Sequence, residues 1–200
     1  VLGVLLSLLF AAHWTEGYAD MIQKGIGGKV VRFHVLANSD SEADQTLKLA
    51  VRDRVLQEYG DLLETCTSKE ETLAALKNAQ QEISETAEAE VLAQGYAYPV
   101  RVSLVREEFP FKKYGDLIFP AGVYDALRIE IGEAKGKNWW CVLYPQMCYV
   151  DAAWGYSTEE SHVRLQNTLT KEEFLVVSAM EQKKITPKIK CRLVELWSER

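Results

Sequence analysis

The sequence lacks the residues and motifs on which the common classes of hydrolase and metalloenzyme depend. It has only three histidines, at positions 13, 34 and 162, and it contains no GxSxG, HExxH or CxxC motif. The first motif presents a nucleophile, the second holds a catalytic zinc, and the third is a frequent zinc or redox motif. Their absence excludes these sites, and we predict a protein with no catalytic residues, no metal and no cofactor.

The chain also lacks an excess of positive charge. Its 200 residues contain 23 Lys and Arg against 29 Asp and Glu, which gives a net charge of −6. Binding to nucleic acid needs a basic surface that neutralises phosphates, and a peripheral membrane helix needs a polybasic face. We therefore expect no nucleic-acid partner. The hydrophobic content of 48% and the charged content of 26% are typical of a soluble globular domain.

Charge is absent altogether from residues 1–12, which read VLGVLLSLLFAA. The run is shorter than the roughly 20 residues that span a bilayer, and it matches the apolar part of a signal peptide. Ala19 precedes Asp20 as a small residue at a cleavage site would. We predict that residues 1–19 are a signal peptide or a membrane segment, and that the natural chain starts upstream because no methionine or basic residue precedes the run. A buried core helix is the alternative.

A segment rich in glycine follows this run. Residues 20–29 contain three glycines, and this composition predicts a linker. Residues 30–36 then alternate in the manner of a strand. The alternation places the side chains of Val31, Phe33 and Val35 on one face of that strand.

Two amphipathic helices are predicted next. The first follows a turn at residues 37–41 whose Asp and Ser side chains can cap it, and it continues to about Tyr59. The second begins at Ser68, where Glu71 completes a capping box, and it stops at Gly95.

The second half of the chain changes to the two-residue period of strands. Alternating segments lie at residues 98–105, 123–131 and 139–144. The last of these is nearly all apolar, so we predict that it is buried on both faces. A helix from about Thr170, with Glu173 as its capping partner, follows.

The grouping of helices apart from strands predicts an α+β fold. We expect an antiparallel-rich sheet packed with helices, in a single domain that follows the N-terminal hydrophobic export segment. The domain is predicted to occupy residues 30–156. Residues 157–200 would form a C-terminal, helical and variable extension.

His34 is the candidate base that the sequence offers, because it lies on the first predicted strand close to Asn38 and Asp40. A histidine next to a carboxylate can have a pKa tuned for proton transfer. A histidine with no catalytic role at the edge of the sheet is the simpler interpretation, and we favour it.

Four cysteines allow two disulfides in an exported protein. Cys141 and Cys148 form the most plausible pair, since they flank Pro145 in a turn between two strands. Free, buried thiols are the alternative, and both interpretations stay open.

Aromatic residues are densest near the end of the predicted domain. Such side chains are most often core residues, but they also dominate protein interfaces and stack on sugars. A loop just before the cluster would favour a contact site. The cluster consists of Trp139, Trp140, Tyr144, Tyr149, Trp154 and Tyr156.

Two stretches resemble one family. Residues 32–55 read RFHVLANSDSEADQTLKLAVRDRV, and residues 109–151 read FPFKKYGDLIFPAGVYDALRIEIGEAKGKNWWCVLYPQMCYVD. Their motifs, LANSD and PAG-x-Y-x-A-L followed by NWWCVL-x-P-x-x-C, are similar to those of stage II sporulation protein R. The resemblance covers residues 30–156. His34 departs from it, because an arginine would be expected there.

The resemblance implies a signal and not an enzyme. Proteins of this family are exported from the forespore into the space between the two membranes. There they activate a membrane-embedded aspartic protease that processes the sigma-E precursor in the mother cell. Membrane association through the N-terminal segment is compatible with this role. As interface residues we expect Asn38, Ser39, Asp40, Asn138, Trp139 and Trp140.

Two other functions agree with export and with the aromatic cluster. One is a cell-wall glycan-binding module or wall hydrolase, which would bind peptidoglycan. The other is a structural domain of a larger membrane assembly, which would keep its N-terminal segment.

Overall fold

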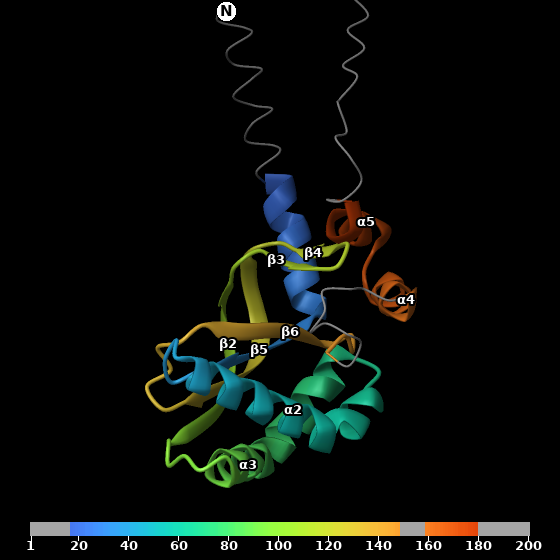
Figure 1. Ribbon diagram of the computed structural model, residues 1–200. Coiled ribbons are helices and arrows are strands. Elements are labelled where there is room, and N and C mark those ends of the chain that lie inside the picture. Colours follow the sequence, from blue (N-terminus) through green and yellow to red (C-terminus); the bar gives the residue numbers. More distant parts are fainter. Residues whose placement is uncertain (1–16, 149–158, 180–200) are drawn as a thin grey trace, which may run out of the picture.

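The computed structural model describes residues 17–148 and 159–179 (Figure 1). Residues 17–29 are helical. The elements that follow are β1 (Val31–Leu36), α2 (Glu42–Glu64), α3 (Lys69–Ala93), β2 (Val100–Phe109), β3 (Lys112–Tyr114), β4 (Leu117–Phe119), β5 (Gly122–Ile131), β6 (Asn138–Tyr144), α4 (Glu159–Thr168) and α5 (Lys171–Ala179).

Four strands form a mixed sheet in the order β2-β5-β1-β6. β1 is parallel to β5, whereas the β1–β6 and β2–β5 pairs are antiparallel. β3 and β4 form a separate two-stranded hairpin. The predicted α+β domain with an antiparallel-rich sheet is confirmed.

The predicted position of His34 at the edge of the sheet is wrong, because β1 lies between β5 and β6. Five of the six β1 residues are buried. The even positions, Arg32 and His34, are buried as well as the apolar odd ones, since each has partners on its own face of the sheet. Burial on both faces is what a central strand requires.

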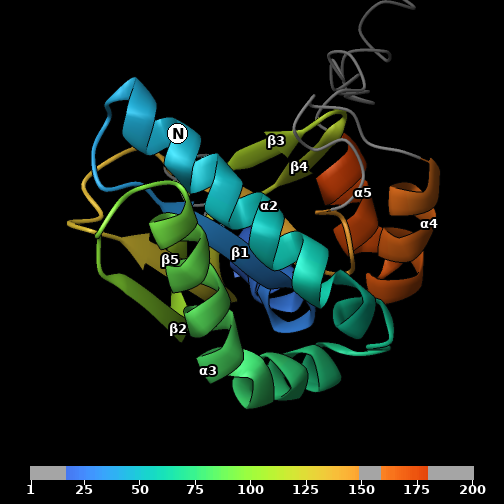
Figure 2. The same cartoon turned by 60° about the horizontal axis from the view of Figure 1, so that its bottom comes forward.

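α2 and α3 cover one face of the sheet, and they pack side by side (Figure 2). The Ser41 side chain caps α2 by accepting a hydrogen bond from the Asp44 backbone, and Ser68 caps α3 in the same way. Their apolar stripes, together with Val31, Phe33 and Val35, form the first hydrophobic core. The predicted caps within residues 37–41 and at Ser68 are therefore confirmed, but α2 continues past the predicted end near Tyr59 to Glu64.

The opposite face is covered by the helix of residues 17–29, the β3–β4 hairpin, α4 and α5 (Figure 1). The prediction of a linker at residues 20–29 is wrong. Two of its three glycines are contact points within a helix: a Cβ at Gly25 would collide with the Glu173 side chain, and one at Gly27 would lie 2.5 Å from the Val123 carbonyl oxygen. Ile22 and Ile26 of this helix belong to the second core.

The C-terminal helices are part of that second core. Leu165, Leu169 and Val177 are buried in it. The predicted capping box of α5 is confirmed, since Glu173 accepts from the Thr170 backbone at 2.8 Å and donates its own N–H to Thr170 Oγ1 at 3.2 Å.

β6 was expected to be buried on both faces, but it is an edge strand. Only its middle residues, Cys141, Val142 and Leu143, are buried. The apolar composition of the segment reflects packing on both sides of its centre, because Cys141 and Leu143 lie in the first core and Val142 in the second.

Candidate functional site

Two loops meet at one end of the sheet, at residues 37–40 and 132–137, and we call them the loop pair. They meet because β1 and β5 are parallel neighbours and so end at the same edge. β6 starts there too, with Asn138 opposite Leu36. The topology thus brings together most of the residues expected at an interface, although they lie about 100 positions apart in the sequence.

Hydrogen bonds lock the two loops to each other. The Gly136 N–H donates to the Ala37 carbonyl at 2.9 Å. The Asn38 side-chain oxygen accepts from the Glu133 N–H at 2.9 Å, and an Asp40 carboxylate oxygen accepts from the Lys137 N–H at 2.6 Å. The amide and carboxylate of the LANSD motif therefore bind loop backbone.

Asp44 ties the loop pair to α2. Its carboxylate accepts from Ser39 Oγ at 2.5 Å and from Asn38 Nδ2 at 2.9 Å. The hydrogen bonds from Ser39 and Asn38 hold the pKa of Asp44 below its ordinary value. The side chains of Asn38, Ser39 and Asp40 are therefore all engaged in hydrogen bonds within the protein.

The two tryptophans lie on opposite faces of β6. The Trp139 ring packs edge-on against Phe33, with centroids 5.7 Å apart, and the Arg52 guanidinium lies 4.8 Å from its centroid. Trp140 stacks on His34, with centroids 4.8 Å apart. The pair does not form one continuous aromatic patch. Tyr149, Trp154 and Tyr156 lie outside the described residues.

His34 is enclosed by Trp140, Phe109 and charged neighbours. Its Nε2 lies 2.7 Å from a Glu107 carboxylate oxygen, and that carboxylate also pairs with Arg128 at 3.0 Å. Burial, aided by the positive charges of Arg128 and Arg32, lowers the pKa of His34 to about 3. His34 is therefore neutral at physiological pH.

Arg32 is the feature that the sequence pattern does not reveal. Its guanidinium is fully buried and donates to the Tyr114 hydroxyl at 2.9 Å, and no described residue forms a hydrogen bond with its Nε or Nη1. Burial lowers its pKa. Four rings from β2, the hairpin and β5 surround it, with centroids 5.0–5.5 Å away, and their faces attract the cation. These rings are Phe109, Tyr114, Phe119 and Tyr124.

The turn after β6 carries a disulfide. Cys141 and Cys148 are bonded, with Cα atoms 5.6 Å apart. The Met147 N–H donates to the Val142 carbonyl at 3.1 Å and closes the turn. Among the described cysteines, Cys66 forms no disulfide, and Cys191 lies outside the described residues.

The described ranges were also compared with the requirements of metal and membrane sites. Within residues 17–148 and 159–179, no group of His, Cys, Asp and Glu could hold a metal ion. No helix in these ranges is long and apolar enough to cross a bilayer. His162 lies 3.1 Å from the Asp116 carboxylate.

Comparison with known proteins identifies the family. The model of the stage II sporulation protein R family matches residues 27–154. Stage II sporulation protein R of Bacillus subtilis (strain 168) is 32% identical over 184 residues, which cover 87% of this chain and 82% of that protein. No solved structure matches. The match spans the sheet, α2, α3 and the loop pair, and the chain belongs to the stage II sporulation protein R family.

Proposed function

We propose that this protein is an exported, non-catalytic signal in endospore formation. It would pass from the forespore into the space between the two membranes and activate the membrane-embedded aspartic protease that processes the sigma-E precursor. The observation that carries this proposal is the family match over residues 27–154, which includes the whole sheet and its first core.

The surroundings of His34 support a role without catalysis. A general base must reach its substrate and must have a pKa near the working pH. His34 is 3% exposed, is stacked against Trp140, and has a pKa of about 3. It acts as a buried polar residue of the sheet.

Reconstitution in a non-sporulating cell tests the proposal. This chain, the protease and the sigma-E precursor are produced together, and the size of the precursor is followed on a gel. We expect processing that requires this chain and persists in His34→Phe and His162→Gln. A chain that lacks residues 1–19 stays in the cytoplasm and should not support processing.

Absence of processing with all components present, and with this chain exported and folded, would contradict the proposal. Binding of the chain to purified peptidoglycan would then favour the glycan-binding alternative. In the present structure Trp139 and Trp140 each pack against other side chains, which disfavours a stacking platform for sugars.

We propose the loop pair and the adjoining residues Asn138, Trp139 and Trp140 as the surface that contacts the protease. Asn138→Ala tests it, because Asn138 is half-buried at the start of β6 and its replacement leaves the bonds that lock the loops intact. Asn78→Ala, at an exposed position of α3, is the matched control. Activation that drops in the first variant only would support this surface, and equal activation would exclude Asn138 from it.

A further inference from the structure

β2 is an edge strand with a free side. It pairs with β5 over its whole length, and in the part of the chain that the structure describes no other strand lies beyond it in the sheet order. An exposed edge offers unpaired N–H and C=O groups to another chain. Which residues offer them follows from the alternation of an antiparallel ladder, in which every second residue bonds to its partner strand.

Two hydrogen bonds fix that alternation. The Gly132 N–H donates to the Pro99 carbonyl at 2.8 Å, which continues the β2–β5 ladder by one pair and places the odd residues of β2 in bonded pairs. The Gln80 side chain donates to the Val102 carbonyl at 3.0 Å, so this even residue faces away from β5. Leu104, Arg106 and Glu108 must therefore point their backbone groups to the free edge.

Nothing in the described part of the chain occupies that edge. Within the described residues, the backbone N–H and C=O groups of residues 104, 106 and 108 form no hydrogen bond with any segment outside the sheet. Val102 is the last edge residue whose backbone accepts a hydrogen bond from α3. The open stretch thus begins at Leu104 and ends where Pro110 closes the strand.

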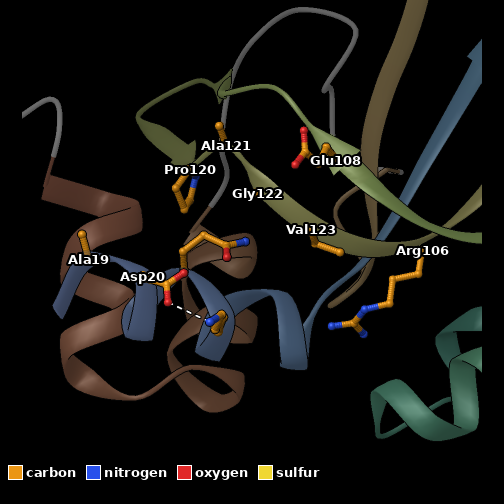
Figure 3. Close-up of a pocket in the computed structure, with 10 residues that line it drawn as sticks. Ala19, Asp20, Arg106, Glu108, Pro120, Ala121, Gly122 and Val123 are labelled. Carbon is orange, nitrogen blue, oxygen red and sulfur yellow. Dashed lines mark ion pairs between the residues drawn. The ribbon is translucent and has the colours of Figure 1, made fainter. Parts of the chain in front are cut away.

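Two side chains along this stretch are charged and exposed. Arg106 and Glu108 are both exposed, and both line an open cleft of about 720 Å³ (Figure 3). Its other walls are the helix of residues 17–29, through Asp20 and Lys24, and the start of β5, through Val123. The cleft leaves room for additional side chains beside Arg106 and Glu108.

Arg106 and Glu108 are both available for a new ion pair. Arg106 contacts Asp125 at 3.1 Å, but Asp125 is also bound by the buried Lys69 at 2.6 Å. One carboxylate thus serves two cations, and Lys69 would still neutralise it if Arg106 turned away. No ion pair of Glu108 is recorded within the described ranges.

We propose that two copies of this protein pair through their β2 edges, antiparallel and centred on Glu107. This register places Arg106 of each copy opposite Glu108 of the other. Both residues have edge-facing backbone groups, so each such pair can exchange both backbone hydrogen bonds. Opposite residues of an antiparallel pair share a face, and the two side chains form a cross-strand ion pair. At the centre, Glu107 of each copy faces Glu107 of the other, and each of these carboxylates is already paired with Arg128 of its own copy at 3.0 Å. The two Arg106–Glu108 pairs therefore make the strand complementary to itself, as a two-fold interface requires.

Charge reversal tests this interface. The 200-residue chain is kept in mild detergent, and its mass is measured by sedimentation velocity over a range of concentrations. We expect a weak dimer, because the paired stretch is short. Arg106→Glu and Glu108→Arg should each be monomeric, since every facing pair then carries like charges. An equimolar mixture of the two variants should restore the dimer, because each mixed pair is again complementary.

Arg101→Glu is the matched control, since Arg101 is an exposed residue of the same strand that lies in a bonded pair with β5. It should dimerise as the unaltered chain does. Circular dichroism establishes that each variant is folded. If a charge-reversal variant unfolds, the neutral variants Arg106→Gln and Glu108→Gln are used in place of the two reversals. A monomeric unaltered chain at every concentration, or dimers in either single reversal, would overturn the proposal. So would a mixture that stays monomeric.

Discussion

The two faces of the sheet are built by different means. The face under α2 and α3 is closed by apolar side chains in regular stripes. The opposite face is closed by the helix of residues 17–29, the β3–β4 hairpin, α4 and α5, and it buries Arg32 and His34. One strand, β1, serves both, because its odd residues point to the first face and its even residues to the second.

This difference shows which of the two cores can be predicted from local sequence patterns. The first face lies within the residues that match the family, 27–154, and uses elements whose periodicity is continuous. The second draws on residues before and after that match, including Ile22 and Val177. Its polar side chains are tolerated only because distant segments surround them.

Adjacent residues of β1 give the largest expected contrast between the faces. Phe33 is fully buried in the first core and packs against Trp139. Phe33→Ala should lower the free energy of unfolding by about 3–5 kcal/mol, because it leaves a cavity in a well-packed core. Chemical denaturation followed by circular dichroism measures this change.

Arg32→Met is the counterpart on the second face. Methionine keeps much of the volume and removes a buried charge whose Nε and Nη1 have no hydrogen-bond partner among residues 17–148 and 159–179. Replacement of buried charges by apolar groups is often neutral, so we expect a change within about 1 kcal/mol. A loss as large as that of Phe33→Ala would show that the four rings stabilise the cation far more than typical cation–π contacts do.

Acid should lower the free energy of unfolding through His34, which lies on the second face. Its pKa is about 3 in the folded protein and near 6.5 when unfolded, so the unfolded chain binds the extra proton between these values. The stability that comes from a neutral His34 is complete above pH 6.5 and is lost as pH falls toward 3. From pH 7 to pH 5 we expect a loss of about 2 kcal/mol that His34→Phe does not show.

The pH dependence is measured by urea denaturation of both proteins at each pH. Glu107, Arg128 and Arg32 face His34 and are present in both proteins, so the difference between the two curves reports on the histidine. Parallel curves would mean that His34 already binds a proton in the folded state through its contact with Glu107.

The sequence predicts the first face well and the second poorly, for a physical reason. The caps at Ser41 and Ser68 and the alternation in residues 30–36 are local, and local patterns survive in the fold. The central place of β1 and the ring cage of Arg32 are set by contacts between segments more than 70 positions apart. The fold brings most of the expected interface residues together at the loop pair. No local pattern predicts that Asn38 and Asp40 bind the backbone of the facing loop.

The smallest predicted effect tests whether residues 20–29 belong to the second core. Both Gly25 and Gly28 are helical. A Cβ at Gly28 meets nothing within 4 Å, so Gly28→Ala should raise the free energy of unfolding by about 0.5–1 kcal/mol through lower chain entropy. A Cβ at Gly25 collides with Glu173, which binds Lys29 Nζ at 2.6 Å and caps α5.

Gly25→Ala should therefore lower the free energy of unfolding by about 1 kcal/mol, because the gain in chain entropy is outweighed by displacement of a buried, hydrogen-bonded carboxylate. In a Glu173→Ala background, Gly25→Ala should raise the free energy of unfolding by as much as Gly28→Ala does, since the collision is then absent. Equal gains at both glycines in the unaltered background would mean that the helix does not pack on α5. The contrast between the faces would then concern only the hairpin and the two polar residues of β1.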